Sequence, residues 1–207
     1  YRDLADPDLQ RLHGVLNGVL TQDIKHLGAC HLYIHATESS QKPELALACA
    51  DHLASSVPMA SHIQHMPSHT WNEVGLWGRS VRANIAANNA DRRAAQGMGF
   101  SYGPTHNLHM LLFAASYDGQ GAVATQAGKD YRKYADDAQF EATTLIRFGR
   151  FDEVLELDHR PDNSASAAIY DFAKGYAMLK SGDPEGAQTT LTAVSYTHLT
   201  LPTNCVV

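Results

Sequence analysis

Seven histidines of this chain recur at matching distances before three successive predicted turns, which are centred at Gln41, Gly75 and Gly119. One histidine lies ten residues before each of the three turns. Others lie six residues before the first two turns and thirteen residues before the last two. The set comprises His31, His35, His62, His65, His69, His106 and His109. Because residues three or four apart share one face of a helix, each predicted helix presents its histidines together.

Clustered imidazoles of this kind favour metal binding. Neutral imidazole is the commonest protein ligand for zinc and also suits copper, iron and nickel. No HExxH motif is present, and two histidines on one helix supply only part of a site, so the ligands must come from several helices. The predicted cofactor is a transition metal such as zinc, copper or iron, and otherwise none. The predicted metal ligands are His31, His35, His65, His69 and His109.

Further polar residues are predicted to bind a ligand beside the metal. Glu38 follows His35 by three residues and Glu73 follows His69 by four, so either carboxylate can complete a two-histidine, one-carboxylate set. If the site is catalytic, we expect metal-assisted hydrolysis or oxidation, with one of these carboxylates as base or additional ligand. The predicted ligand-binding residues are His62, His106, Asn107, Glu38, Glu73 and Asn84.

The two asparagines each have two interpretations. Asn84 lies on the second predicted helix of its unit, where it either orients a histidine or caps a local backbone group. Asn107, between His106 and His109, either binds the ligand or faces solvent.

A groove without metal is the competing hypothesis. The same histidines can line a surface that hydrogen-bonds a small molecule or an extended peptide, which makes the protein an interaction module. A third use is a pH switch, because imidazoles protonated below about pH 6.5 repel one another. Four further histidines, His13, His26, His52 and His159, are predicted to be structural.

Pro67 interrupts the second histidine-bearing segment. Proline inside a helix removes one backbone hydrogen bond and costs roughly 3 kcal/mol, unless the helix bends or begins there. Either geometry changes the direction in which the side chains of His62 and His65 point relative to that of His69. The residue therefore marks strain at a functional site, or a helix that simply starts at Met66.

The elements that position these residues are all predicted to be helices. Apolar residues recur at steps of three and four, as at Leu9, Leu12 and Leu16, while strict alternation is absent. Asp6-Pro7 and Asp183-Pro184 each offer an N-cap followed by proline at the first helical position. The fold class is therefore predicted to be all-α.

A repeat organises these helices. Predicted turns at Gln41, Gly75, Gly119, Gly149 and Gly182 are separated by 34, 44, 30 and 33 residues, and a small or apolar residue follows each turn by five. A helix–turn–helix unit of about 34 residues cannot bury its apolar face alone, so such units stack. The longer interval is expected to contain a glycine-rich loop over residues 92–103.

The turn segments resemble tetratricopeptide-repeat turns. They are "VGLWGRSVRANIAA" (74–87), "SYDGQGAVATQA" (116–127), "RFGRFDEVLEL" (147–157) and "LKSGDPEGAQTTL" (179–191). Over residues 28–118, "HLYIHATESS", "HIQHMPSHTW" and "YGPTHNLHML" resemble more specifically a histidine-rich group of bacterial tetratricopeptide-repeat proteins. The resemblance implies an α-solenoid of antiparallel helix pairs whose first helices line a concave groove. It departs from the repeat pattern at Gln41, Pro67 and Asn84.

Composition excludes other classes. The chain has 207 residues, 44% of them hydrophobic, and a formal net charge of −6, which suits one globular domain and disfavours a nucleic-acid surface. The longest apolar stretch, "LHMLLFAAS", is too short to span a bilayer. Cys30 and Cys49 are predicted to be buried as small hydrophobic residues, because no CxxC spacing is present.

The two ends are expected to differ from the native protein. The chain starts at Tyr1, so we expect an N-terminally truncated repeat domain over residues 1–194. Residues 195–207, "SYTHLTLPTNCVV", resemble translated sequencing adapter of the kind found in metagenomic fragments. They are predicted to be a non-native tail that breaks the helical pattern.

Overall fold

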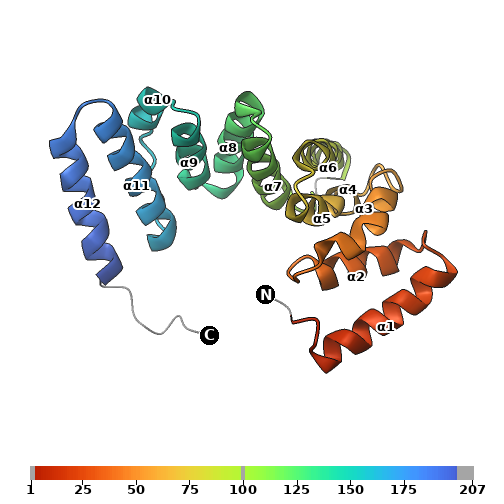
Figure 1. The fold of residues 1–207 in the computed structure, drawn as a ribbon. Coiled ribbons are helices and arrows are strands. Elements are labelled where there is room, and N and C mark those ends of the chain that lie inside the picture. Colours follow the sequence, from red (N-terminus) through yellow and green to blue (C-terminus); the bar gives the residue numbers. More distant parts are fainter. Residues whose placement is uncertain (1–2, 99–100, 200–207) are drawn as a thin grey trace. The chain divides into compact units, whose positions relative to one another are not determined.

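The computed structural model describes residues 3–98 and 101–199, and in this part of the chain all regular structure is helical (Figure 1). The all-α prediction is therefore confirmed. The chain divides into two compact units, residues 1–119 and 120–207. A single repeat domain over residues 1–194 stays a prediction.

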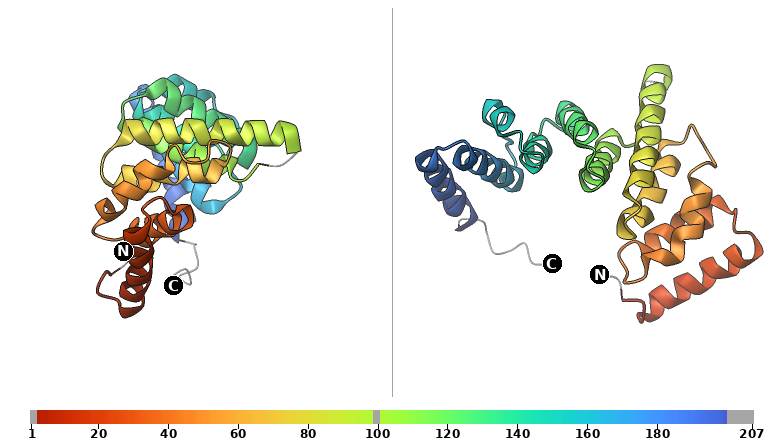
Figure 2. Two further views of the ribbon diagram at one scale, coloured as in Figure 1. Left: turned by 90° about the vertical axis from the view of Figure 1, so that its right-hand side faces the viewer. Right: turned by 45° about the horizontal axis from the view of Figure 1, so that its top comes forward.

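The first unit carries all seven histidines. Its elements are α1 (Pro7–Gln22), α2 (Leu27–Thr37), the 3-10 helix η1 (Pro43–Ala46), α3 (Leu47–Leu53), α4 (Ser61–His65), α5 (Pro67–Glu73), α6 (Trp77–Met98) and α7 (Pro104–Tyr117). Ile34, Leu53 and Met66 are fully buried in its core. The long helix α6 packs against α4, α5 and α7, so it supports three of the four histidine-bearing elements (Figure 2).

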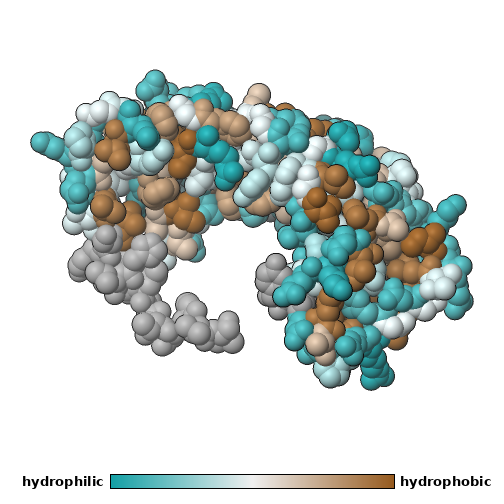
Figure 3. Space-filling model, viewed as in Figure 1, coloured by the Kyte–Doolittle hydropathy of each residue, from teal (hydrophilic) through white to brown (hydrophobic). Residues whose placement is uncertain are grey.

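The second unit is built from α8 (Gly121–Ala135), α9 (Gln139–Arg147), α10 (Phe151–Glu156), α11 (Ser164–Lys180) and α12 (Pro184–Leu199). Its core contains Leu145, Val154 and Tyr170, and the Tyr170 hydroxyl donates to the Leu157 carbonyl at 2.8 Å. Apolar side chains also remain at the surface over α11 and α12 (Figure 3). They include Phe172, Leu179 and Leu191.

The turn glycines occur where the sequence predicted them. Gly75, Gly119, Gly149 and Gly182 each follow one helix and precede another, and each has φ between 69° and 89°. Glycine adopts this left-handed conformation without the steric penalty of a Cβ atom, which explains its use at the ends of α5, α7, α9 and α11.

The predicted N-caps are also present. The Asp6 carboxylate accepts hydrogen bonds from the amides of Asp8 and Leu9, and Pro7 starts α1. The Asp183 carboxylate likewise accepts from the Gly186 amide, and Pro184 starts α12. Both aspartates satisfy amides that have no partner within the helix.

The loop expected over residues 92–103 is largely helical instead. Helix α6 continues to Met98, so the prediction is wrong for residues 92–98. Arg, Ala and Gln dominate this stretch and are strong helix formers, which outweighs the cost of Gly97. Residues 99–100 lie outside the described residues, and residues 101–103 precede α7.

Pro67 separates two short helices. Helix α4 ends at His65, Met66 is the junction, and Pro67 is the first residue of α5, where a missing N–H costs no helical hydrogen bond. The simpler interpretation of Pro67, a helix that begins there, is therefore the one observed.

The two buried cysteines are bonded to each other, which corrects the prediction that they act only as small hydrophobic residues. Cys30 of α2 and Cys49 of α3 form a disulfide, with Cα atoms 4.8 Å apart. Because the two cysteines lie 19 positions apart in the sequence, no short motif predicts that they pair. The bond ties α2, which carries His31 and His35, to α3.

At the C-terminal end, α12 continues through Leu199, so the expected break in the helical pattern at residue 195 is not observed. Residues 200–207 of the predicted tail lie outside the described residues. Among the described helices, none combines the length and the apolar character needed to cross a bilayer.

Candidate metal centre

Four elements of the first unit bring the histidines together. His31 and His35 lie on α2, His62 and His65 on α4, and His69 on α5, while α7 carries His106 and His109. Six of the seven form two groups, and in each group ring nitrogens from the three residues lie within 4.8 Å of one another. We refer to them as the His65 group (His65, His69, His106) and the His31 group (His31, His35, His62).

His65 is the most enclosed member of its group. Its side chain is fully buried, and its ring centroid lies 4.6 Å from that of His69 and 4.5 Å from that of His106. The Nε2 atoms of His65 and His69 are 2.7 Å apart. His106, which comes from α7, is the exposed member of the group.

Asn84 of α6 fixes the tautomer of His65. Its Nδ2 donates to the Ser80 carbonyl at 2.9 Å, which turns its Oδ1 toward Nδ1 of His65, also at 2.9 Å. An amide oxygen only accepts, so Nδ1 of His65 carries the hydrogen. Nε2 of neutral His65 therefore presents its lone pair toward His69.

Glu38 imposes the same tautomer on His69. Nδ1 of His69 lies 2.5 Å from Oε2 of Glu38, and a carboxylate likewise only accepts. Although burial alone would raise the pKa of Glu38, hydrogen bonds from His69 and His35 lower it to about 2. Glu38 is therefore ionised at neutral pH, and Nδ1 of His69 is its donor.

Two nitrogen lone pairs consequently face each other at 2.7 Å when both rings are neutral. Burial, followed by the charge of His69, lowers the pKa of His65 well below its usual value, so His65 resists protonation. Facing lone pairs repel unless a cation lies between them, and only a proton or a metal ion meets that need. The two rings can thus hold a cation between their Nε2 atoms.

The His31 group repeats the pattern on the neighbouring surface. Nε2 of His31 and Nε2 of His62 are 3.0 Å apart, and the His35 ring lies 4.9 Å from that of His31. Burial, followed by the charge of neighbouring histidines, lowers the pKa of His31 and brings that of His62 to about 4. His35 donates from Nδ1 to Oε1 of Glu38 at 3.0 Å.

A cavity of about 400 Å³ opens beside the His65 group. Its lining includes Glu38, His69, Asn72 and Phe113, together with His109, which belongs to neither of the two groups found among the described residues. Burial lowers the pKa of His109. A ligand in this cavity has direct access to His69.

The predicted carboxylates have different surroundings. Glu38 lies between the two groups, and each of its oxygens already contacts a histidine, Oε1 that of His35 and Oε2 that of His69. Glu73, the last residue of α5, is exposed at the wall of the cavity.

Asn107 does not face solvent, which corrects one of its two interpretations. It is buried, and its Nδ2 donates to Oδ2 of Asp91 at 2.7 Å. Oδ1 of the same aspartate accepts from the backbone amide of Tyr102 at 3.0 Å, and the Tyr102 ring lies 4.7 Å from that of His62. Asp91 and Tyr102 were not predicted from the sequence, since neither recurs with the turns.

Three of the histidines predicted to be structural contact residues outside the two groups. Nδ1 of His26 accepts from the Ala29 amide at the start of α2, and Nε2 of His52 lies 3.1 Å from the Lys25 carbonyl. His159 pairs with Asp136 in the second unit. None of these rings belongs to the two groups among the described residues.

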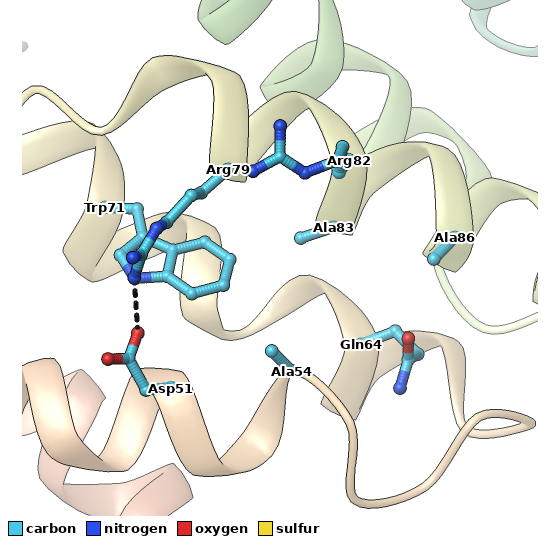
Figure 4. Close-up of a pocket in the computed structure, with 8 residues that line it drawn as sticks. All are labelled: Asp51, Ala54, Gln64, Trp71, Arg79, Arg82, Ala83 and Ala86. Carbon is cyan, nitrogen blue, oxygen red and sulfur yellow. Dashed lines mark hydrogen bonds and ion pairs between the residues drawn. The ribbon is translucent and has the colours of Figure 1, made fainter.

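A second cavity of the first unit, about 490 Å³, is lined by different types of side chain. Arg79 lies over the Trp71 ring at 5.8 Å and donates to Asp51 at 2.9 Å (Figure 4). Its lining contains arginine, aspartate and glutamine but no histidine. The cavity beside His69 is therefore the one that serves the candidate metal centre.

No protein-family model, no curated protein and no solved structure matches the chain. The function must be inferred from the residues of the chain itself.

Proposed function

We propose that this protein is a transition-metal-binding helical-repeat scaffold whose primary metal site is the His65 group. The observation that carries the proposal is the pair of facing Nε2 atoms of His65 and His69, which lie 2.7 Å apart. The Nδ1 atoms of the two rings face the oxygen acceptors of Asn84 and Glu38. A metal ion accepts both lone pairs. His106 supplies a third nitrogen from a different helix.

The donor set favours particular metals. Three neutral imidazoles suit zinc, copper, iron or nickel, and three protein ligands leave a further coordination position for water or a bound molecule. A tetrahedral zinc at about 2.0–2.1 Å from each nitrogen holds two ligand atoms about 3.3 Å apart. A small opening of the His65–His69 pair is sufficient to reach that spacing.

The partners of the ligands support the same proposal. Metal-bound histidines characteristically donate their other ring nitrogen to a carboxylate or a carbonyl oxygen, which orients the ring. Here Glu38 and Asn84 supply these acceptors for His69 and His65. The cavity of about 400 Å³ provides room for a small molecule next to the open coordination position.

We infer that the helices form a tetratricopeptide-like solenoid. Support comes from the four left-handed glycines, which join α5 to α6, α7 to α8, α9 to α10 and α11 to α12 at the predicted turns. An experimental structure showing these pairs stacked at a constant rotation would agree with the inference. Pairs that do not stack successively would contradict it.

Cobalt binding tests the metal proposal. Untagged protein is treated with chelator, dialysed and titrated with Co²⁺, whose visible absorption reports nitrogen coordination. We expect at least one tightly bound equivalent in the native chain and one equivalent fewer in His65→Gln, with His159→Gln as the control. A native chain that shows no absorption and retains no zinc, copper, nickel or cobalt contradicts the proposal. If that chain binds extended peptides, it is instead the interaction module.

A further inference from the structure

The two histidine groups are direct neighbours. The ring of His35 lies 5.6 Å from that of His69, and the ring of His62 is stacked at 6.2 Å on that of His65. Each of these contacts joins one member of the His31 group to one member of the His65 group. A ligand held by one group therefore lies beside a ligand held by the other.

One carboxylate serves both groups. Oε1 of Glu38 accepts from Nδ1 of His35 at 3.0 Å, while Oε2 lies 2.5 Å from Nδ1 of His69. The hydrogen on Nδ1 leaves Nε2 of each ring as the lone-pair atom. Glu38, with a side chain only 19% exposed, thus sets the tautomer of one candidate ligand in each group.

The nitrogen spacings divide the six rings into two sites. His31 and His62 approach through Nε2 at 3.0 Å, and His65 and His69 approach through Nε2 at 2.7 Å. Ligand nitrogens on one ion lie within about 4.2 Å of one another, since each is about 2.0–2.1 Å from the metal. Two close pairs, each with a third histidine nearby, fit two ions better than one shared ion.

Resting on the proposed function, we propose that the chain holds two transition-metal ions side by side, one in each group, as a dinuclear centre with Glu38 as the common outer partner. Six neutral imidazoles bring no negative charge, and Glu38 brings one. Two divalent ions therefore retain a positive charge that attracts a small bridging anion, such as hydroxide. Two-metal sites of this kind activate a bridging water or stabilise both ends of a substrate oxygen.

Copper loading tests the pairing in the full chain. Untagged, chelator-treated protein is loaded with Cu²⁺ and desalted, and bound copper is then counted by elemental analysis and by integrated electron paramagnetic resonance. We expect two copper ions per chain and a spin count well below the total copper, because bridged ions couple. His31→Gln and His65→Gln should each bind one ion whose spin is fully detected, and His159→Gln should match the native chain.

The outcomes separate the two proposals. Native protein that binds no copper overturns the metal site itself. One ion per chain, lost in His65→Gln and retained in His31→Gln, leaves the proposed function standing and overturns the pairing. Two ions with a full spin count show independent sites, which also overturns the dinuclear centre. Circular dichroism of each variant confirms that the helices are intact.

Glu38→Gln tests the shared carboxylate. Loss of an outer acceptor typically weakens metal binding 10- to 100-fold, so we expect both ions to dissociate more readily, by about that factor. Glu44→Gln, on the exposed side of η1, is the matched control and should stay within about twofold of the native chain. Weakening of only one ion overturns the role of Glu38 as a common partner.

Discussion

At the scale of single residues, the candidate centre depends on side chains that hold imidazoles in one tautomer. Asn84 does this for His65, and Glu38 does it for His35 and His69. Such fixing matters because a free imidazole exchanges its hydrogen between two nitrogens, only one of which points at the ion. Metal binding then needs no change of tautomer or ring orientation, which lowers its free-energy cost.

Replacing Asn84 by leucine should therefore weaken metal binding. The variant leaves the buried Nδ1–H of His65 without its acceptor, so we expect a 10- to 100-fold loss of affinity and a stability loss of about 1–3 kcal/mol. Competition against a chromogenic chelator and urea unfolding measure the two effects. Asn89→Leu, at an exposed position of the same helix, is the control. Equal affinity in the two variants contradicts the role of Asn84.

Acidification should destabilise the metal-free protein over two successive pH ranges. The folded pKa of His62 is lowered from 6.5 to about 4, so the unfolded chain takes up its proton first, and stability falls between these values. The folded pKa of Glu38 is lowered from 4.5 to about 2, so its stabilisation is complete above pH 4.5 and is lost toward pH 2. The second contribution amounts to about 3 kcal/mol.

Urea unfolding with chelator present, at pH values from 7 to 3, measures this dependence. Glu38→Gln cannot ionise and should lose the change below pH 4.5 while keeping the change above it. A profile that is flat from pH 7 to 4 would show that the histidine groups accept protons without cost.

At the scale of elements, the structure adds a covalent tie that the helical pattern does not contain. The Cys30–Cys49 disulfide joins α2 to α3, and Cys30 directly precedes His31. The position of α2 therefore depends on this bond as well as on packing. Of the two groups, the His31 group is the more sensitive, because two of its three histidines are on α2.

Reduction should lower the stability of the protein. A disulfide that closes a loop of about 20 residues contributes about 3 kcal/mol in the chain-entropy account. We expect a phosphine reductant to lower the melting temperature of the native chain and to leave a Cys30→Ala, Cys49→Ala variant unchanged. Differential scanning calorimetry with and without reductant compares them. Equal melting of the native chain in both conditions would contradict the contribution of the bond.

The elements show what a sequence can predict here. Helical spacing, proline after an N-cap and glycine at turns are local signals, so the all-helical fold, the turns and the helices that carry the histidines were predictable. His62 and His106 belong to the two groups and His109 does not. This division depends on distances between helices, which the sequence does not give. The bond between Cys30 and Cys49 was not predictable either, because the two cysteines lie 19 positions apart and helical spacing does not show which distant residues are in contact.

Local signals also conflicted within one helix. Glycines around residue 97 suggested a loop, yet the Arg, Ala and Gln residues before them extend α6 to Met98. Just before this stretch, Asp91 accepts from Asn107 and from the backbone of Tyr102, whose ring lies 4.7 Å from that of His62. These polar contacts join residues of α6 and α7 that no spacing along the chain relates to each other.

At the scale of the whole molecule, metal binding should appear as a gain in the stability of the first unit. Both tryptophans of the chain, Trp71 and Trp77, lie in that unit, so their fluorescence reports its unfolding alone. Free metal at 100 times its dissociation constant adds about 2.7 kcal/mol, which raises the melting temperature by several degrees. We expect this shift with zinc or copper and a smaller shift in His65→Gln, which keeps only the His31 group. An unchanged fluorescence transition in the native chain contradicts metal binding to the folded unit.

The cross-link between α2 and α3 also has a consequence for biosynthesis. Glutathione and thioredoxin keep most thiols reduced in the bacterial cytosol, whereas paired cysteines persist after export or in strains with an oxidising cytosol. Protein made in these two ways will therefore differ in one covalent bond next to the histidines. Thiol counts on each preparation should accompany every measurement of bound metal.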